Sequence, residues 1–183
     1  GEADFMARKA WTYRDGGSYG LNSYGKPALV MQTLESLLGE ETMVRVLRTW
    51  ARRHRFAHPT TGDFISTVNE VTGQDWQWFF DQTFFTANLC DYAVEVTNEP
   101  ARRPGGWFEG KDGTLERRTA GGEKEDGDEG RFESRVTVVR HGEVLLPVEL
   151  RVELADGRVV RETANGRDRC ARFRYEGAKV VRA

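Results

Sequence analysis

Cysteine, histidine and long apolar runs are all scarce in this sequence of 183 residues, which contains two cysteines and three histidines. Cys90 and Cys170 lie far apart, so they form neither a Cys-x-x-Cys metal motif nor the dense disulfide pattern of a small secreted scaffold. We expect two buried free thiols, or one disulfide if their strands prove to be neighbours. No apolar run approaches the roughly 18–20 residues of a membrane-spanning helix, so we expect no membrane span.

The sequence also lacks an excess of charge of either sign. Its 27 basic and 29 acidic residues give a net charge of −2. The charges are evenly divided, with nine basic and ten acidic residues in 1–90, and eighteen and nineteen in 91–183. Neither half has the basic excess of a nucleic-acid-binding domain, so we expect no nucleic-acid partner.

Several catalytic motifs are missing as well. The sequence contains no Gly-x-Ser-x-Gly elbow and no glycine-rich phosphate loop between a strand and a helix. His54 and His58 have the spacing of half a helical zinc site. However, Arg55 occupies the position where a metallopeptidase needs glutamate, and Pro59 disfavours helical geometry at His58. We therefore interpret the two histidines as a solvated pair at a helix end.

The first half of the sequence shows helical periodicity instead. Its strongest signal covers 23–39, where Ser23 is placed to cap the helix, Pro27 lies in the first turn and Gly39 ends the helix. Apolar residues three and four apart, such as Val30 and Leu34, predict one buried face. An irregular or helical lead-in is expected over 1–22, and further helices over 40–56, 63–71 and 76–85.

Near residue 89 the apolar period changes from 3.6 to 2, which is typical of strands. Alternation predicts antiparallel strands at 92–97, 132–139, 144–154, 159–163, around 173–175 and at 179–181. Pro147 lies within one of them, which favours an edge position or a bulge. The stretch 98–130 contains eight glycines and many charges; we expect a long loop whose centre, 121–130, is mobile.

These patterns predict an α+β fold with two domains. Residues 1–88 would form an antiparallel helical segment. Residues 89–183 would form a small antiparallel β-sandwich of the immunoglobulin or fibronectin kind, carrying the long loop at about 98–130.

Tyr24 directly follows Ser23 at the start of the strongest helix. Taken alone, a tyrosine in this position is more often a packing residue than a catalytic one. Its context, however, resembles the gluzincin aminopeptidases, the aminopeptidase N family, in which Tyr-x-Lys-Gly or Tyr-x-Lys-Pro opens a helix beside zinc. The similarity covers about 19–97 and, more loosely, 136 to the C-terminus. Its motifs are Ser23–Met31, Leu34–Glu40, Thr60–Phe64 and Gly73–Gln82.

The resemblance implies that 1–88 is the end of a thermolysin-like catalytic domain, in a piece of a longer zinc aminopeptidase. Such a parent removes N-terminal amino acids from peptides with a zinc-activated water. Tyr24 matches the family tyrosine whose neutral phenol donates a hydrogen bond to the tetrahedral oxyanion. The zinc-binding His-Glu-x-x-His and the Gly-x-Met-Glu-Asn motif are absent from 1–183. We therefore expect zinc in the parent, and neither zinc nor activity in this chain alone.

The expected partners are the upstream zinc-binding half and, in the parent, a peptide substrate. The helical surface that faces the missing half should be apolar, which would favour oligomerisation or weak solubility. Two alternatives remain: a non-catalytic scaffold or interaction module from the same family, and an unrelated adaptor. Resemblance to bacterial members favours an exported, periplasmic protein, whereas substrate preference does not follow, because the specificity pocket would lie largely upstream.

Overall fold

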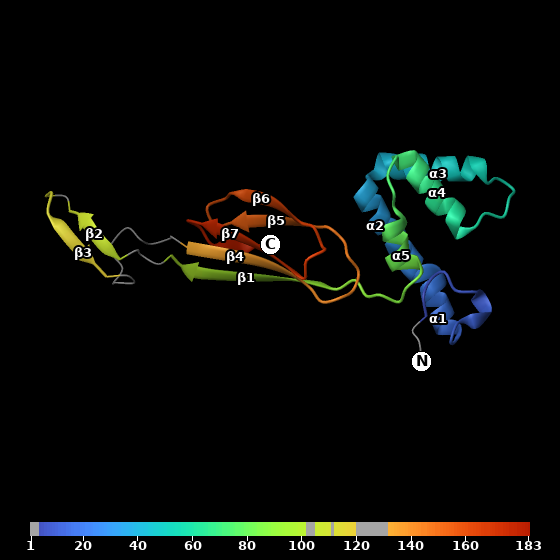
Figure 1. The fold of residues 1–183 in the computed structure, drawn as a ribbon, viewed down its shortest axis with the longest axis horizontal. Coiled ribbons are helices and arrows are strands. Elements are labelled where there is room, and N and C mark those ends of the chain that lie inside the picture. The colour runs from blue at the N-terminus through green and yellow to red at the C-terminus, as the bar shows by residue number, and fades with distance from the viewer. Residues whose placement is uncertain (1–3, 102–104, 111, 120–131) are drawn as a thin grey trace. The chain divides into compact units, whose positions relative to one another are not determined.

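The fold is that of a computed structural model, which describes residues 4–101, 105–110, 112–119 and 132–183. Helices precede antiparallel strands along the chain, so the expected α+β class is confirmed (Figure 1). The chain divides into two compact units, Gly1–Leu89 and Cys90–Ala183. Within the described ranges, no helix has the length and apolar character that crossing a membrane requires.

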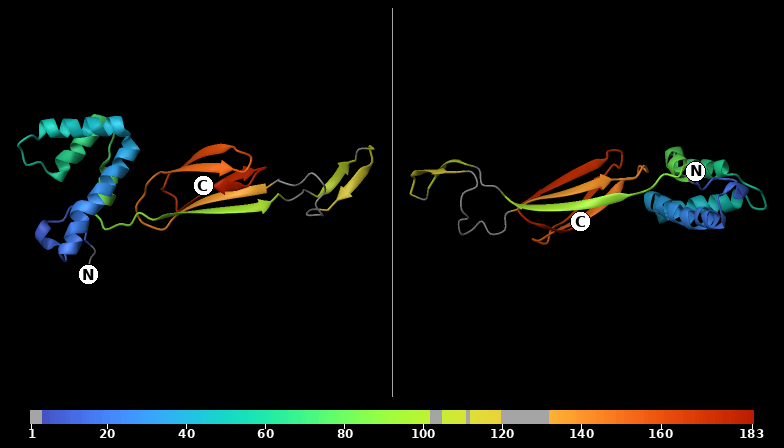
Figure 2. Two further views of the ribbon diagram at one scale, coloured as in Figure 1. Left: turned by 180° about the vertical axis from the view of Figure 1, so that it is seen from behind. Right: turned by 90° about the horizontal axis from the view of Figure 1, so that it is seen from below.

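The first unit is helical. Its elements are η1 (Ala10–Thr12), α1 (Gly16–Gly20), the π-helical turn η2 (Leu21–Gly25), α2 (Lys26–Leu38), α3 (Glu40–Arg53), α4 (Thr61–Thr72) and α5 (Gln77–Phe84). Helices α3 and α4 lie side by side in every view (Figure 2). Their inward faces and those of α2 and α5 form an apolar core of Val30, Leu34, Met43, Val46, Ile65, Val68, Trp76, Phe79 and Phe80.

Helix α4 shows how the sequence fixes the ends of these helices. Thr60 and Asp63 form a capping box, in which the backbone N–H of each residue donates to the side chain of the other, at 2.7 and 3.3 Å. The box satisfies N–H groups that have no partner within the helix. The helix ends at Gly73, whose φ of 69° is left-handed, as a C-terminal glycine cap requires.

The expected helix start at Ser23 is wrong. The helix begins at Gly16, where the Asp15 side chain accepts a hydrogen bond from the backbone of Ser18 at 2.7 Å. It continues through η2 into α2, so Ser23 lies inside it. Pro27 is tolerated there because η2 widens the helix by one residue. A wider turn relieves the clash between a proline ring and the carbonyl four residues earlier.

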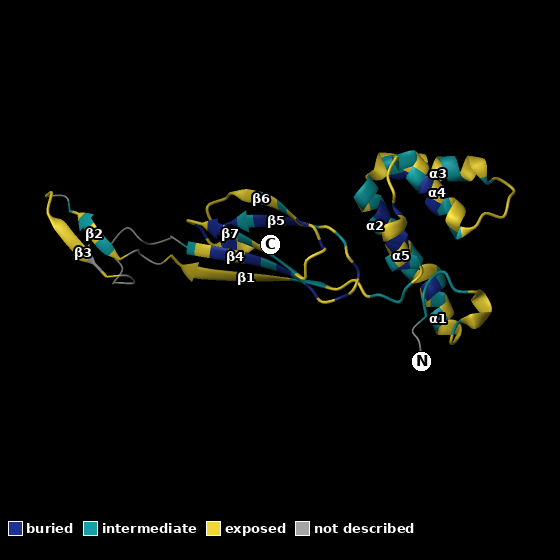
Figure 3. Cartoon of the chain, in the orientation of Figure 1, coloured by how far each residue is buried: buried dark blue, intermediate teal, exposed yellow. Residues whose placement is uncertain are grey.

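The second unit contains two three-stranded antiparallel sheets, with strand orders β1-β4-β7 and β6-β5-β8. The strands are β1 (Tyr92–Pro100), β4 (Phe132–Arg140), β5 (Val148–Leu154), β6 (Val159–Ala164), β7 (Cys170–Glu176) and β8 (Val180–Arg182). Buried residues concentrate on β4 and β5, whereas most of β1 is exposed (Figure 3).

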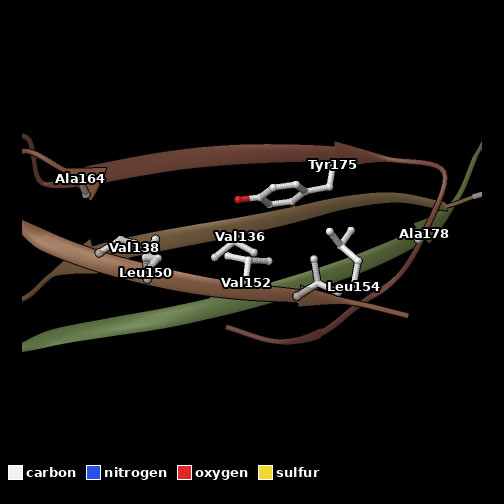
Figure 4. Packing of buried hydrophobic residues seen from close by; sticks show 9 residues of the cluster. Val136, Val138, Leu150, Val152, Leu154, Ala164, Tyr175 and Ala178 are labelled. Atoms are coloured by element: carbon white, nitrogen blue, oxygen red, sulfur yellow. The ribbon is translucent and has the colours of Figure 1, made fainter. Parts of the chain in front are cut away.

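Both sheets contribute side chains to one hydrophobic core. Val136 of β4, Tyr175 of β7 and Val152 of β5 belong to the same buried cluster (Figure 4). Alternate residues of a strand point to the same face, so the period-2 pattern of the sequence becomes one apolar layer per sheet. Two sheets that share a core agree with the expected sandwich.

Asn98 on β1 joins the two sheets by hydrogen bonds. Its Oδ1 accepts from the Val180 backbone N–H at 2.9 Å, and its Nδ2 donates to the Val180 carbonyl at 3.0 Å. The hydroxyl of Ser134 on β4 lies 2.6 Å from the same Oδ1. Because β8 pairs with β5 in the other sheet, this amide gives polar backbone groups between the sheets their partners.

The expected edge position or bulge at Pro147 is also wrong. Strand β5 begins immediately after Pro147 and is the central strand of its sheet, so the missing N–H lies outside the ladder. The hydroxyl of Tyr92 holds the preceding segment, lying 2.9 Å from the Val144 carbonyl and accepting from Leu146 N at 2.9 Å. At Gly166 (φ 71°) a Cβ would lie 1.8 Å from the Leu146 oxygen, so only glycine fits.

The stretch 98–130 differs from the single loop that its composition predicts. Strand β1 continues to Pro100, and β2 (Gly106–Glu109) pairs with β3 (Leu115–Arg118) in an antiparallel hairpin. The Gly110 N–H donates to the Thr114 carbonyl at 2.7 Å in the turn. Strand-forming residues such as Trp107 lie among the glycines and charges that dominate the composition. Residues 121–130, expected to be mobile, lie outside the described residues.

The helical core gives a matched test of burial. Leu34 is fully buried in α2, whereas Leu29 in the same helix is 65% exposed. We predict that Leu34→Ala lowers the free energy of unfolding by about 2–5 kcal/mol, because it leaves a cavity. Leu29→Ala should change it by no more than about 0.5 kcal/mol. Urea denaturation measures both, and equal losses would contradict the described core.

Candidate functional site

Tyr24, the residue that the sequence singles out, lies in the π-turn η2, and the residue is 68% exposed. Single π-turns within α-helices are rare, and they occur frequently at functional sites. The extra residue in the turn shifts the side-chain register on either side of it. Tyr24 is therefore an exposed phenol on an irregular turn of a continuous helix.

Tyr24 is the last member of a row of three tyrosines. The rings of Tyr19 and Tyr24 meet edge to face with centroids 6.2 Å apart, and those of Tyr13 and Tyr19 do the same at 5.6 Å. The Tyr13 hydroxyl donates to the carbonyl of Met6 at 2.8 Å, so the lead-in anchors one end of the row. Edge-to-face packing fixes the relative orientation of the rings.

The contact with Tyr19 makes Tyr24 a weaker acid. A hydrogen bond with the Tyr19 side chain raises the pKa of Tyr24 above its ordinary value of 10.0, and charge repulsion with Tyr19 and desolvation act in the same direction. The hydrogen bond favours the protonated form because only that form donates. Tyr24 carries its proton at neutral pH and can donate it in a hydrogen bond.

Asp4 holds the start of the helix in place, which the sequence did not predict. Its carboxylate, only 4% exposed, pairs with Arg8 and accepts hydrogen bonds from the Ser18 hydroxyl at 2.5 Å and from Arg14 N at 3.0 Å. The bond from Ser18 is the largest cause that lowers the pKa of Asp4, followed by that from Arg14. A carboxylate with three donors stays ionised, so it ties the lead-in to α1 at neutral pH.

The described residues offer no set of zinc ligands. Over the described residues, no group of three His, Cys, Asp or Glu side chains is arranged to hold a metal ion. The described residues therefore do not fit a zinc site.

Among the described residues, the histidines and cysteines do not gather into a metal site. His54 ends α3 and packs on Trp50 at 4.3 Å between ring centroids, and its buried Nε2 has no hydrogen-bond partner among the described residues. His58 is exposed, so the interpretation as a solvated pair is wrong for His54. Cys90 and Cys170 are both free, and Cys90 is exposed; the expectation of buried thiols is wrong for Cys90.

A cavity of about 580 Å³ lies beside the tyrosine row. Its lining includes Tyr13, Tyr19 and Asn22, and also Trp50 and Phe64. Tyr24 is not part of the lining, so Tyr19 lies between the cavity and the exposed phenol. The lining residues come from the lead-in, from the continuous helix over 16–38, from α3, α4 and α5, and from the segment just before α4. No local pattern of the sequence could have revealed this cavity.

Comparison with known proteins gives a distant structural likeness. No family model matches the chain, and no curated protein matches it. Among solved structures, the chain is similar to Legionella pneumophila aminopeptidase A, solved in complex with aspartic acid, with a TM-score of 0.51 and 13% sequence identity. The likeness covers 96% of this chain and 18% of that chain. It shows a shared fold over a short part of that aminopeptidase.

The tyrosine row makes a prediction about proton affinity. Tyr19→Phe removes the partner that stabilises the protonated form of Tyr24, so the pKa of Tyr24 should fall towards its ordinary value. NMR titration of ¹³C-labelled tyrosine rings measures this pKa. Tyr13→Phe is the control, because the Tyr13 hydroxyl bonds to Met6 instead. An unchanged pKa in Tyr19→Phe would show that the two phenols do not interact.

Proposed function

We propose that this chain is part of a gluzincin zinc aminopeptidase, supplying the end of the catalytic domain and the following β-sandwich. The observation that carries the proposal is Tyr24: an exposed, neutral phenol on the π-turn of a helix that bears the family motifs. The likeness to an aminopeptidase over 96% of this chain supports the same direction. The zinc ligands would lie in the upstream half, since the sequence lacks His-Glu-x-x-His and the described residues offer no ligand set.

In this proposal Tyr24 acts as a hydrogen-bond donor to the oxyanion that forms when a peptide carbonyl is attacked. A donor aimed at developing charge stabilises the transition state more than the ground state. The raised pKa of Tyr24 suits this role, because a phenolate would repel the oxyanion.

An exposed apolar stripe on the same helix supports a covering partner. Leu21 and Leu29 are each 65% exposed and lie on either side of Tyr24 along the helix. Exposed apolar patches of this kind mark interaction surfaces. We assign the upstream, zinc-binding half of the parent as the partner, and self-association when that half is missing.

The same stripe favours a second candidate function. A non-catalytic scaffold derived from the family would keep an apolar docking surface without needing zinc. The two functions differ at Tyr24, because a scaffold has no chemical use for a neutral phenol at this turn. Peptidase activity in a longer protein that carries the upstream residues would therefore distinguish the aminopeptidase from the scaffold.

The first test compares this chain with a longer protein that carries its native upstream residues. We predict bound zinc and hydrolysis of aminoacyl-anilides for the longer protein, and neither for residues 1–183 alone. Metal analysis and a spectrophotometric assay measure the two properties. A longer protein without zinc and without turnover would overturn the peptidase proposal and favour the scaffold.

The second test is Tyr24→Phe in the longer protein. Removing one oxyanion donor should lower kcat about 10²- to 10³-fold, with little change in KM or in stability. Tyr13→Phe is the matched control, since it removes a hydroxyl that bonds to a backbone carbonyl, and it should keep near-normal kcat. A near-normal kcat in Tyr24→Phe would end the assignment of Tyr24.

A further inference from the structure

The cavity beside the tyrosine row has the features of a ligand site of its own. Its volume of about 580 Å³ lies within the roughly 300–1,000 Å³ of small-molecule sites. Its lining combines aromatic and aliphatic side chains with polar ones such as Arg8, Asn22 and Thr61. Trp50 and Phe64 meet edge to face at 5.1 Å. Such a contact gives one wall a fixed aromatic surface, which suits a flat aromatic ring.

Asn22 supplies an unused polar group in this lining. The residue is only 7% exposed, and its Nδ2 donates to the Ser18 carbonyl at 3.0 Å. A carbonyl can only accept, so this bond fixes which end of the amide is nitrogen. The Oδ1 atom is therefore an acceptor, and none of the described residues donates to it. Oδ1 is not one of the buried side-chain atoms that lack a partner, so water can reach it, and a ligand N–H would take the place of that water.

We propose that this cavity binds an aromatic ring that carries an N–H donor, with the ring against Trp50 and Phe64 and the N–H bonded to Asn22 Oδ1. Indole is the simplest molecule with this chemistry. The same group also occurs as a tryptophan side chain, so the ligand is either a free aromatic molecule or a residue of a peptide. The proposal does not depend on the aminopeptidase function, because Tyr24 and zinc take no part in it.

The chain contains three methionines, and their positions make them reporters. Met6 and Met31 line the cavity, whereas Met43 is buried in the core and is not part of the lining. We would label the methionine methyl groups with ¹³C in the 183-residue chain and titrate indole by NMR. The signals of Met6 and Met31 should shift and saturate, while that of Met43 stays in place. Benzofuran, which has the same shape but an oxygen in place of N–H, is the matched probe.

Indole should bind roughly two- to tenfold more tightly than benzofuran, as expected for one net hydrogen bond. In Asn22→Ala the two probes should bind equally, with the affinity for benzofuran kept. Asn165→Ala, in the other unit, should leave the preference for indole unchanged. If Asn22→Ala does not fold, the comparison of indole with benzofuran in the unmodified chain still tests the proposal.

Three results would overturn the proposal: no saturating shift at Met6 and Met31, equal shifts at all three methionines, or equal affinity for both probes in the unmodified chain. N-acetyl-tryptophanamide then separates the two sources of the ring. Tighter binding than indole assigns a peptide side chain, and weaker binding assigns a free aromatic molecule. Both of these outcomes support the site itself.

Discussion

The helical unit depends on how one proline is accommodated. Pro27 has no N–H, and its ring would clash with a carbonyl one turn earlier in a regular α-helix. The π-turn at Leu21–Gly25 removes this conflict, so the helix runs unbroken from Gly16 to Leu38. The orientation of Tyr24 and the exposed stripe around it follow from this local solution. The tyrosine row, the cavity and the docking surface are therefore all connected to one irregular turn.

Much of the fold was predictable from the sequence because its driving forces are local or periodic. Helices α2 to α5 follow from apolar spacing, and the strands follow from alternation. The glycine end of the second helical segment at Gly39 was readable because a short-range backbone hydrogen bond decides it. Such signals depend on neighbouring residues and not on the tertiary fold.

The wrong sequence predictions arose where the same short pattern is compatible with two different local structures. Ser23 and Pro27 form a plausible helix start, and only the fold around Asp4 and Asp15 shows that the helix begins earlier. The hairpin of β2 and β3 was hidden by the glycines on either side of it. The residues of the candidate site likewise differ in how far the sequence predicts them. A motif singled out Tyr24, but its neighbour Tyr19 and the amide of Asn22 gain their roles only from contacts that folding creates.

The contact between Gly166 and Leu146 bears on how this protein can change during evolution. Any side chain at position 166 would collide with a backbone oxygen that the Tyr92 hydroxyl helps to hold. Every missense codon there is therefore expected to be lost from a population, although the residue takes part in no chemistry. In a deep mutational scan of this unit, Gly166 would look as constrained as a catalytic residue. Intolerance to substitution alone would therefore not distinguish a steric constraint of this kind from a functional one.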